Sequence, residues 1–320
     1  MSPSSRVVTA ASGLMVASGA AALAWGTLVE RNAFTVREDT VPVLAPGARE
    51  LTVLHLSDLH MAPWQQSKQQ WISALRVYEP DLVVATGDLL GHRHGLEGVR
   101  AALDVFAGVP GVYVHGSNDY YGPLLKNPFT YFTGPTSTPK RPDTLDTAAL
   151  EEYLDSLGWL NLNNTARAMT IKGSRLEFVG VDDPHIARDR LDRIPGALDE
   201  LRENVGWSDD SFGPEVRTIG LTHAPYRRVL NSLVTNGADM IFAGHTHGGQ
   251  VCVPGVGALV TNCDIPRSQV RGVSLWQHAL RGAYLNVSAG LGTSIYAPVR
   301  FACRPEASIV TLTGDDIGYS

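Results

Sequence analysis

The chain has 320 residues, of which 44% are hydrophobic and 18% are charged, and its formal net charge is −6. This length allows one large domain or two small ones, with a sizeable core. The negative charge argues against a nucleic-acid partner, because binding to a phosphate backbone needs a basic surface. Cys252, Cys263 and Cys303 have no Cys-x-x-Cys spacing and cannot all pair within one chain, so no role is assigned to them.

The first 29 residues are predicted to be a transmembrane anchor or a signal segment. From Val7 to Val29 the chain carries no charge, and about 20 apolar residues span a bilayer. Ala22-Leu23-Ala24 would also suit a signal cleavage site, and a buried N-terminal helix is the remaining alternative. Arg6 favours an N-terminus inside the cell, so the rest of the chain is expected outside the cytoplasm, either membrane-associated or secreted. Residues 30–49 are predicted to be a linker.

The first half of the remaining chain alternates between apolar strands and amphipathic helices. Strands are predicted at 51–56, 81–86 and 112–115, and helices at 65–78 and 95–107. A β-α-β-α-β order requires a largely parallel sheet covered by helices. Residues 123–142, rich in Pro, Thr, Gly and Lys, are predicted to be a long surface loop.

The second half contains more strands with fewer helices between them. A helix is predicted at 147–157, a hairpin at 169–172 and 175–179, and strands at 218–222, 239–243, 283–287 and 307–312. This spacing favours a second, mixed sheet. We therefore expect an α/β fold in which two facing mixed β-sheets are flanked by helices, an α-β-β-α sandwich, over one domain at residues 50–315.

Five apolar strands are each followed by a side chain that can bind a metal ion. These segments are 54–60, 84–88, 114–119, 220–223 and 242–250, and the last reads Phe-Ala-Gly-His-Thr-His-Gly-Gly-Gln. Ligands bind outside the carboxyl ends of strands in such sheets, so these side chains are expected to converge. Carboxylate and imidazole groups suit Mn, Fe, Zn or Mg.

The spacing of the candidate ligands suggests how two ions would share them. Asp58 and His60, two residues apart, can bind one ion together, and the two oxygens of Asp88 can bridge two ions. His245 and His247 can each bind one ion. Two metals about 3.5–4 Å apart neutralise phosphate oxygens and convert a bridging water into hydroxide that attacks phosphorus.

These motifs resemble those of the calcineurin-like metallophosphoesterases: Asp-x-His, Gly-Asp, Gly-Asn-His-Asp/Glu, a lone His, and Gly-His-x-His. The resemblance covers roughly residues 50–312 and is closest to a membrane-linked bacterial branch, with its characteristic segments at 57–60, 180–184 and 244–250. It implies the sandwich fold and two metal positions. One would be held by Asp58, His60, Asp88 and His247, and the other by Asp88, the Asn of the third motif, His223 and His245.

The third motif departs from the family pattern. It reads Gly116-Ser117-Asn118-Asp119, so a gapless alignment puts Ser117 at the metal-binding Asn and Asn118 at the His that protonates the leaving group. We expect Asn118 to be the ligand after a local shift, which leaves the general acid missing. His92 and His94, soon after Asp88, are the candidate substitutes, and His92 is the one assigned a catalytic role; a solvated loop with two surface histidines is the alternative.

The predicted function is therefore a dinuclear metal-dependent hydrolase. It would act on a phosphomonoester, phosphodiester or diphosphate by attack of a metal-bridging hydroxide, and a lipid or cell-envelope phosphate suits the predicted membrane link. The catalytic residues are predicted to be Asp88, Asn118 and His92, with no organic cofactor. The alternative is a metal-binding sensor or interaction protein with little turnover, which the altered third motif supports.

Overall fold

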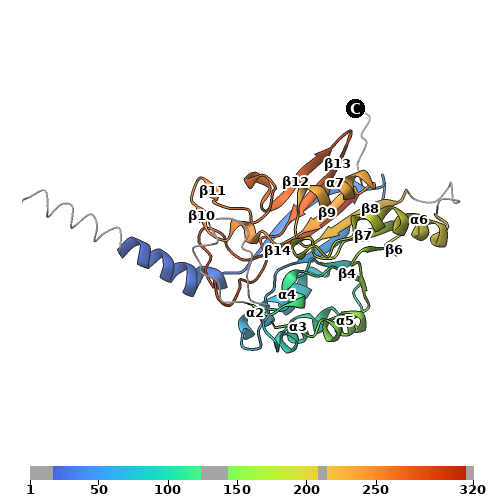
Figure 1. Cartoon of the computed structure of the whole chain (residues 1–320). Helices are drawn as coiled ribbons and strands as arrows, with labels where there is room; N and C mark the ends of the chain where they lie inside the picture. The colour runs from blue at the N-terminus through green and yellow to red at the C-terminus, as the bar shows by residue number, and fades with distance from the viewer. Residues whose placement is uncertain (1–16, 124–142, 208–214, 315–320) are drawn as a thin grey trace, which may run out of the picture.

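The computed structural model describes residues 17–123, 143–207 and 215–314. Two six-stranded sheets form the centre of this part of the chain (Figure 1). The first sheet has the order β1-β14-β2-β3-β4-β5. Its strands are β1 (Thr35–Leu44), β2 (Leu51–Leu56), β3 (Leu82–Ala85), β4 (Gly111–Tyr113), β5 (Trp159–Asn161) and β14 (Glu306–Gly314). β2 to β5 pair in parallel, as the β-α-β-α-β pattern predicts, and β14 runs antiparallel to β2.

The second sheet has the order β12-β13-β9-β8-β7-β6. Its strands are β6 (Thr165–Ile171), β7 (Ser174–Gly180), β8 (Arg217–Thr222), β9 (Met240–Ala243), β12 (Gly272–His278) and β13 (Arg281–Val287). The inner strands pair in parallel and both outer pairs are antiparallel. The predicted mixed sheet is thus confirmed, and the predicted hairpin is the β6–β7 pair, which turns at Lys172 and Gly173.

Helices cover the outer faces of both sheets (Figure 1). After β1, the α-helices are α2 (Gln66–Ala74), α3 (Gly95–Leu103), α4 (Ser117–Tyr120), α5 (Thr147–Ser156), α6 (Ile194–Val205) and α7 (Arg227–Thr235). Short 3₁₀ turns are η3 (Leu75–Tyr78), η4 (Asp104–Phe106), η6 (Pro184–Ile186), η7 (Leu191–Arg193), η9 (His247–Gly249) and η10 (Arg267–Gln269), and a small hairpin joins β10 (Cys252–Val253) to β11 (Gly257–Ala258).

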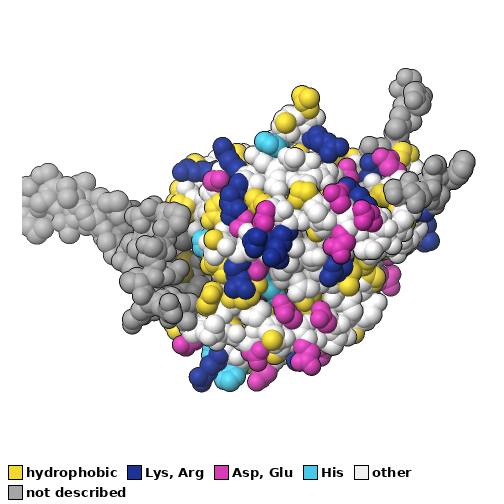
Figure 2. All heavy atoms as spheres, turned by 45° about the vertical axis from the view of Figure 1, so that its right-hand side comes forward, with side chains coloured by type: hydrophobic (Ala, Val, Ile, Leu, Met, Phe, Trp, Pro, Cys, Tyr) yellow, Lys and Arg dark blue, Asp and Glu magenta, His cyan; other side chains and the backbone are white. Residues whose placement is uncertain are grey.

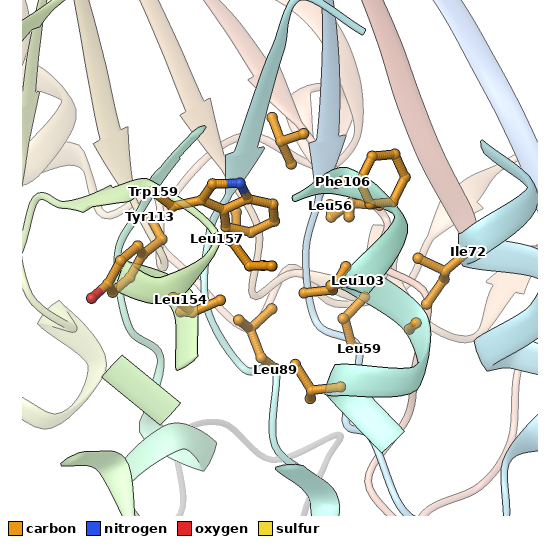
Figure 3. Packing of buried hydrophobic residues seen from close by; sticks show 14 of the residues in the cluster. Leu56, Leu59, Ile72, Leu89, Leu103, Phe106, Tyr113, Leu154, Leu157 and Trp159 are labelled. Carbon is orange, nitrogen blue, oxygen red and sulfur yellow. The ribbon is translucent and has the colours of Figure 1, made fainter. Parts of the chain in front are cut away.

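Three apolar layers hold the sandwich together. Successive side chains of a strand point to opposite faces. In β2, Leu51 and Val53 therefore join the layer between the two sheets, whereas Leu54 and Leu56 face α2, α3 and α5. Figure 3 shows this outer layer, with Phe106 and Leu103 packed beside Leu56. A third layer lies between the second sheet and α6 and α7.

The linker predicted for residues 30–49 is wrong for most of its length. Thr35–Leu44 forms β1, which pairs in parallel with β14 from Thr35 to Pro42 and, after a shift in register, again at Leu44. The Arg37 side chain also contacts a strand of each sheet. Its Nη2 donates to Asn286 Oδ1 of β13 at 2.6 Å and to Ser308 Oγ of β14 at 2.7 Å. This stretch is therefore part of the domain.

The N-terminal run is only partly within the described residues, because residues 1–16 lie outside them. Residues 17–24 are helical and continue into η1 (Trp25–Val29) and η2 (Glu30–Asn32). Within the described ranges, no helix is both long and apolar enough to cross a membrane. Residues 124–142 of the predicted loop also lie outside the described part of the chain.

Acidic and basic side chains are interspersed on the face shown in Figure 2. On that face, no extended region carries charge of a single sign. The absence of a nucleic-acid partner stays a prediction.

His55 on the inner face of β2 makes the stability of the fold depend on pH. Burial, aided by the charge of Arg37, lowers the pKa of His55 to about 3. Below about pH 6.5, the usual pKa of histidine, the unfolded state binds up to one more proton at this residue than the native state does. The free energy of unfolding therefore decreases as the pH is lowered, by up to about 1.4 kcal/mol per pH unit. The free energy of unfolding can be measured in urea with chelator present, at about pH 4.5 and about pH 6. The difference between the two pH values should be smaller for His55→Asn than for the wild type. An unchanged dependence would contradict this assignment.

Candidate metal centre

The predicted ligands do follow the carboxyl ends of neighbouring strands, and backbone hydrogen bonds join the loops that carry them. Asp58 and His60 follow β2, and Asp88 follows β3. Asp58 N donates to Gly87 O, and His60 N donates to Asp88 O, both at 2.9 Å. In the second sheet, Gly244 N donates to His223 O at 2.9 Å, which joins the loops after β8 and β9.

The first group of ligand atoms comes from Asp58, His60 and His247. The Nε2 atoms of His60 and His247 lie 3.3 Å apart, and His247 Nε2 lies 3.5 Å from Asp58 Oδ1. Asp88 Oδ2 is 3.6 Å from His60 Nε2. The structure thus brings together the four residues predicted for one metal position.

The second group is built around the same Asp88 carboxylate. Asp88 Oδ2 lies 3.5 Å from His223 Nε2, and His223 Nε2 lies 3.3 Å from His245 Nδ1. The side-chain amide of Asn118 lies 2.6 Å from Asp88 Oδ2, and Asn118 N donates to Asp88 Oδ1 at 2.8 Å. Asp88 therefore lies between the two groups, as its predicted bridging role requires.

Backbone carbonyls select the tautomer of three histidines. His223 Nδ1 lies 2.7 Å from Thr86 O, and His245 Nε2 lies 3.2 Å from Asn262 O. His247 Nδ1 lies 3.2 Å from Gly292 O. Because a carbonyl can only accept, each contact favours a proton on the nitrogen that it faces, and leaves the other ring nitrogen as the one that would bind a metal once it is deprotonated.

The arrangement fits metal ions by two independent criteria. Asp58 Oδ1 is buried without any hydrogen-bond partner in the described residues, and a buried carboxylate oxygen is costly unless it is paired or binds a metal. Ligand atoms about 2.1 Å from one tetrahedral ion are about 3.4 Å apart. The separations of 3.3, 3.5 and 3.6 Å match that spacing.

The backbone at the centre is bent into the left-handed region. Asp58, His60, Asp88, His245 and His247 all have positive φ, between 40° and 67°. Such conformations are uncommon outside glycine, cost of order 1–3 kcal/mol each, and cluster at functional sites. Sharp turns of this kind let two ligands from one loop point to the same place.

Burial and mutual contact shift the pKa values of the ligands. Burial opposes charge on both Asp88 and His223, but their contact lowers the pKa of Asp88 and raises that of His223 well beyond their usual ranges. Burial lowers the pKa of His247 to about 4 and that of His245 well below its usual value. His245 and His247 are thus neutral at pH 7, and metal binding is expected to release a proton from His223.

The family model of the calcineurin-like phosphoesterases matches residues 51–249. That stretch is more than half of the chain and contains all of the predicted metal ligands. The chain belongs to the calcineurin-like phosphoesterase family.

Two bacterial relatives cover most of this phosphoesterase. It is 25% identical over 287 residues to YkoQ, an uncharacterized metallophosphoesterase of Bacillus subtilis, with 87% of this chain and 91% of YkoQ covered. It is 26% identical over 274 residues to the Bacillus subtilis protein YpbG, with 84% of each covered. Among solved structures, a dimetal phosphatase from Danio rerio aligns over 75% of this chain and 88% of its own, at 14% identity and a TM-score of 0.40.

The altered third motif of the phosphoesterase places Asn118, not Ser117, against Asp88. The Ser117 hydroxyl lies 3.4 Å from Asn118 Nδ2, whereas that amide lies 2.6 Å from Asp88. The oxygen and nitrogen of an amide are assigned from such networks, so a 180° rotation would present Asn118 Oδ1 there instead. Asn118 thus lies where the predicted ligand is needed.

Alanine substitutions should separate the two residues. We expect Asn118→Ala to weaken Mn²⁺ binding by about tenfold or more, because mutation of a residue that only hydrogen-bonds to a metal ligand already lowers the affinity by that factor. Ser117→Ala should change binding less than about threefold. Equilibrium dialysis with elemental analysis measures both. A larger effect of Ser117→Ala would overturn the assignment.

Among the described residues, no contact is seen between His92 and a candidate metal ligand. Its ring lies 5.0 Å from that of Trp64 and 5.5 Å from that of His94, and Trp64 is 62% exposed. Its predicted catalytic role is untested and stays a prediction.

Sequence reasoning did not place His185 or Tyr226, which lie next to the metal centre. The His185 ring is 4.6 Å from that of His245, and His185 Nδ1 lies 3.0 Å from the Tyr226 hydroxyl. The Gly180–Pro184 segment just before His185 was the available signal, but only the fold shows that η6 approaches His245.

Proposed function

We propose that the phosphoesterase hydrolyses a phosphomonoester, phosphodiester or diphosphate with two divalent ions, Mn, Fe, Zn or Mg. The observation that carries the proposal is the position of Asp88. Its carboxylate lies within 3.6 Å of both His60 and His223, so one residue serves two groups of ligands. When bound, two such ions would neutralise phosphate oxygens and lower the pKa of a coordinated water.

The chain's own residues contribute orientation and exclusion of water. Asp58, His60, Asp88 and His223 are all nearly or fully buried, which strengthens electrostatic interactions at the centre. The two Asp119 oxygens accept from the Leu89, Leu90 and Gly116 amides, and so hold the third motif against the loop of Asp88. This support fixes Asn118 beside the shared carboxylate.

The third motif favours substrates with a good leaving group, because Gly116–Asp119 contains no histidine that could protonate it. Loss of a general acid costs about 10²–10⁴ in rate. This loss matters little when the leaving group is itself a phosphate. A diphosphate or an aryl ester therefore suits the centre better than an alkyl ester.

The decisive experiment combines metal analysis with a substrate panel. Purified full-length protein should bind two Mn²⁺ and hydrolyse bis-p-nitrophenyl phosphate, p-nitrophenyl phosphate or a diphosphate ester faster than glycerol phosphate. Two bound ions without hydrolysis of any of these would favour the alternative, a metal-binding sensor or interaction protein, which the loss of the family histidine supports. Protein that cannot bind metal would exclude both.

A membrane-linked location is the second part of the proposal, and with it a lipid or cell-envelope phosphate. Its support is the uncharged run before residue 30 together with Leu23, Trp25 and Leu28, which are 53–70% exposed. Full-length protein should sediment with membranes after a high-salt wash and need detergent for release. Mass spectrometry of its N-terminus separates an anchor from a cleaved signal. Recovery of the intact chain in the soluble fraction would overturn this part.

A further inference from the structure

Arg300 is a fully buried charged residue beside the metal centre. Its Nη2 donates to the carbonyls of Ala289 and Gly292 at 2.7 Å and to that of Gly290 at 3.0 Å. A guanidinium group presents its donors in a rigid fork. Arg300 therefore fixes the backbone of residues 289–292, which runs past the first group of ligands.

One of these carbonyls orients a metal ligand. Gly292 O accepts from Arg300 and also lies 3.2 Å from His247 Nδ1. Arg300 Nη2 lies 3.4 Å from the same nitrogen. A fixed Gly292 carbonyl keeps the proton of His247 on Nδ1, and so keeps Nε2 free to face Asp58 and His60.

The N-terminal segment holds the loop that carries Arg300. Arg300 N donates to Gly26 O at 3.1 Å. Glu30 is 6% exposed, and its Oε1 accepts from Cys303 N at 2.7 Å, while its Oε2 accepts from Trp25 Nε1 at 3.0 Å. Burying a carboxylate is costly unless it is hydrogen-bonded, and here both oxygens are. Glu30 thus joins the segment at 25–32 to the segment at 299–303.

We propose that Glu30 is a positioning residue of the metal centre, acting on His247 through the 299–303 segment, Arg300 and Gly292. The inference rests on the proposed two-metal function and extends it to a segment that lies before the matched domain. The N-terminal segment is then required for full metal affinity as well as for attachment to the membrane.

The test measures Mn²⁺ affinity of the detergent-solubilised full chain by competition with a chelator. The ion whose binding is lost in His247→Ala identifies the His247 position. Glu30→Ala should weaken binding at that position by about tenfold, since outer partners of metal ligands contribute about 10–100-fold. Glu38, an exposed carboxylate of β1, is the matched control; Glu38→Ala should leave both ions unchanged. Glu30→Gln, which keeps one acceptor oxygen for Cys303 N, should restore most of the affinity.

A double-mutant cycle separates this positioning from general destabilisation. If Glu30 acts through His247, adding Glu30→Ala to His247→Ala should weaken the remaining ion by less than about twofold, because the effects of coupled residues do not add. Unchanged binding in folded Glu30→Ala would overturn the proposal. Equal weakening of both ions, or additivity with His247→Ala, would do so as well.

If Glu30→Ala does not fold, Arg300→Lys replaces it. Lysine keeps the charge but lacks the fork of donors. It should weaken the His247 position about tenfold and have no added effect in the His247→Ala background, and unchanged binding would overturn the proposal. A wild-type chain that binds no Mn²⁺ would instead mean that the proposed function has failed.

Discussion

Asp88→Asn is expected to lower the rate of hydrolysis of bis-p-nitrophenyl phosphate by at least about 100-fold. Mutation of a residue that only hydrogen-bonds to a metal ligand typically costs about 10–100-fold, and Asp88 should contribute more than that. The reason is that Asp88 lies against ligands of both groups, at 3.6 Å from His60 and 3.5 Å from His223. Asparagine keeps the size of the side chain but removes the negative charge and one acceptor oxygen. Elemental analysis of the variant should show fewer than two ions per chain.

Asp239→Asn is the matched control for this substitution. Asp239 precedes β9, at the opposite end of that strand from His245, and its Oδ2 accepts from Thr218 N at 2.9 Å. The control should keep both ions and its activity, with at most a modest loss of stability. If Asp88→Asn retained wild-type turnover, Asp88 would not be the bridge between two metals.

Removal of the metals is expected to lower the melting temperature of the protein by about 10 °C. An ion at 100 times its Kd stabilises the native state by about 2.7 kcal/mol, and two ions by about 5 kcal/mol. Each kcal/mol shifts the midpoint by about 2–4 °C in a domain of 150–250 residues. The buried Asp58 Oδ1 adds to this expectation, because it has no hydrogen-bond partner among the described residues and a bound metal would pair with it.

Differential scanning calorimetry with and without chelator measures the shift, and re-added Mn²⁺ should reverse it. Asp88→Asn should show a smaller shift than the wild type, and Asp239→Asn the same shift. A melting temperature that is independent of chelator and of added Mn²⁺ would mean that these residues do not bind ions.

The convergence of the candidate metal ligands was largely predictable because these residues follow strands that are easily recognised. Asp58, Asp88 and His223 each come within three residues of the end of a short apolar strand, and parallel strands bring their carboxyl ends to the same edge of their sheet. The order of the motifs therefore carried most of the spatial information. The same logic predicted the two mixed sheets and their flanking helices.

Contacts between distant segments of the chain could not be predicted in this way. β1 contains Arg37, Glu38, Asp39 and Pro42, which do not resemble a buried strand, and its pairing depends on β14 at the other end of the chain. Likewise, the roles of Gly292 and Arg300 arise only when the loop after β13 folds back over His247. Periodicity within a short window holds no information about such partners.

The positive φ angles of five candidate ligand residues restrict how this centre can be redesigned. Asp, Asn, His and Gly tolerate that region, whereas β-branched side chains do not. A library aimed at a different metal should therefore draw only on the tolerant residues at Asp58, His60, Asp88, His245 and His247. Exchanging the nitrogen and oxygen donors among these turns is then a more practical route to new metal selectivity than introducing ligands of other shapes.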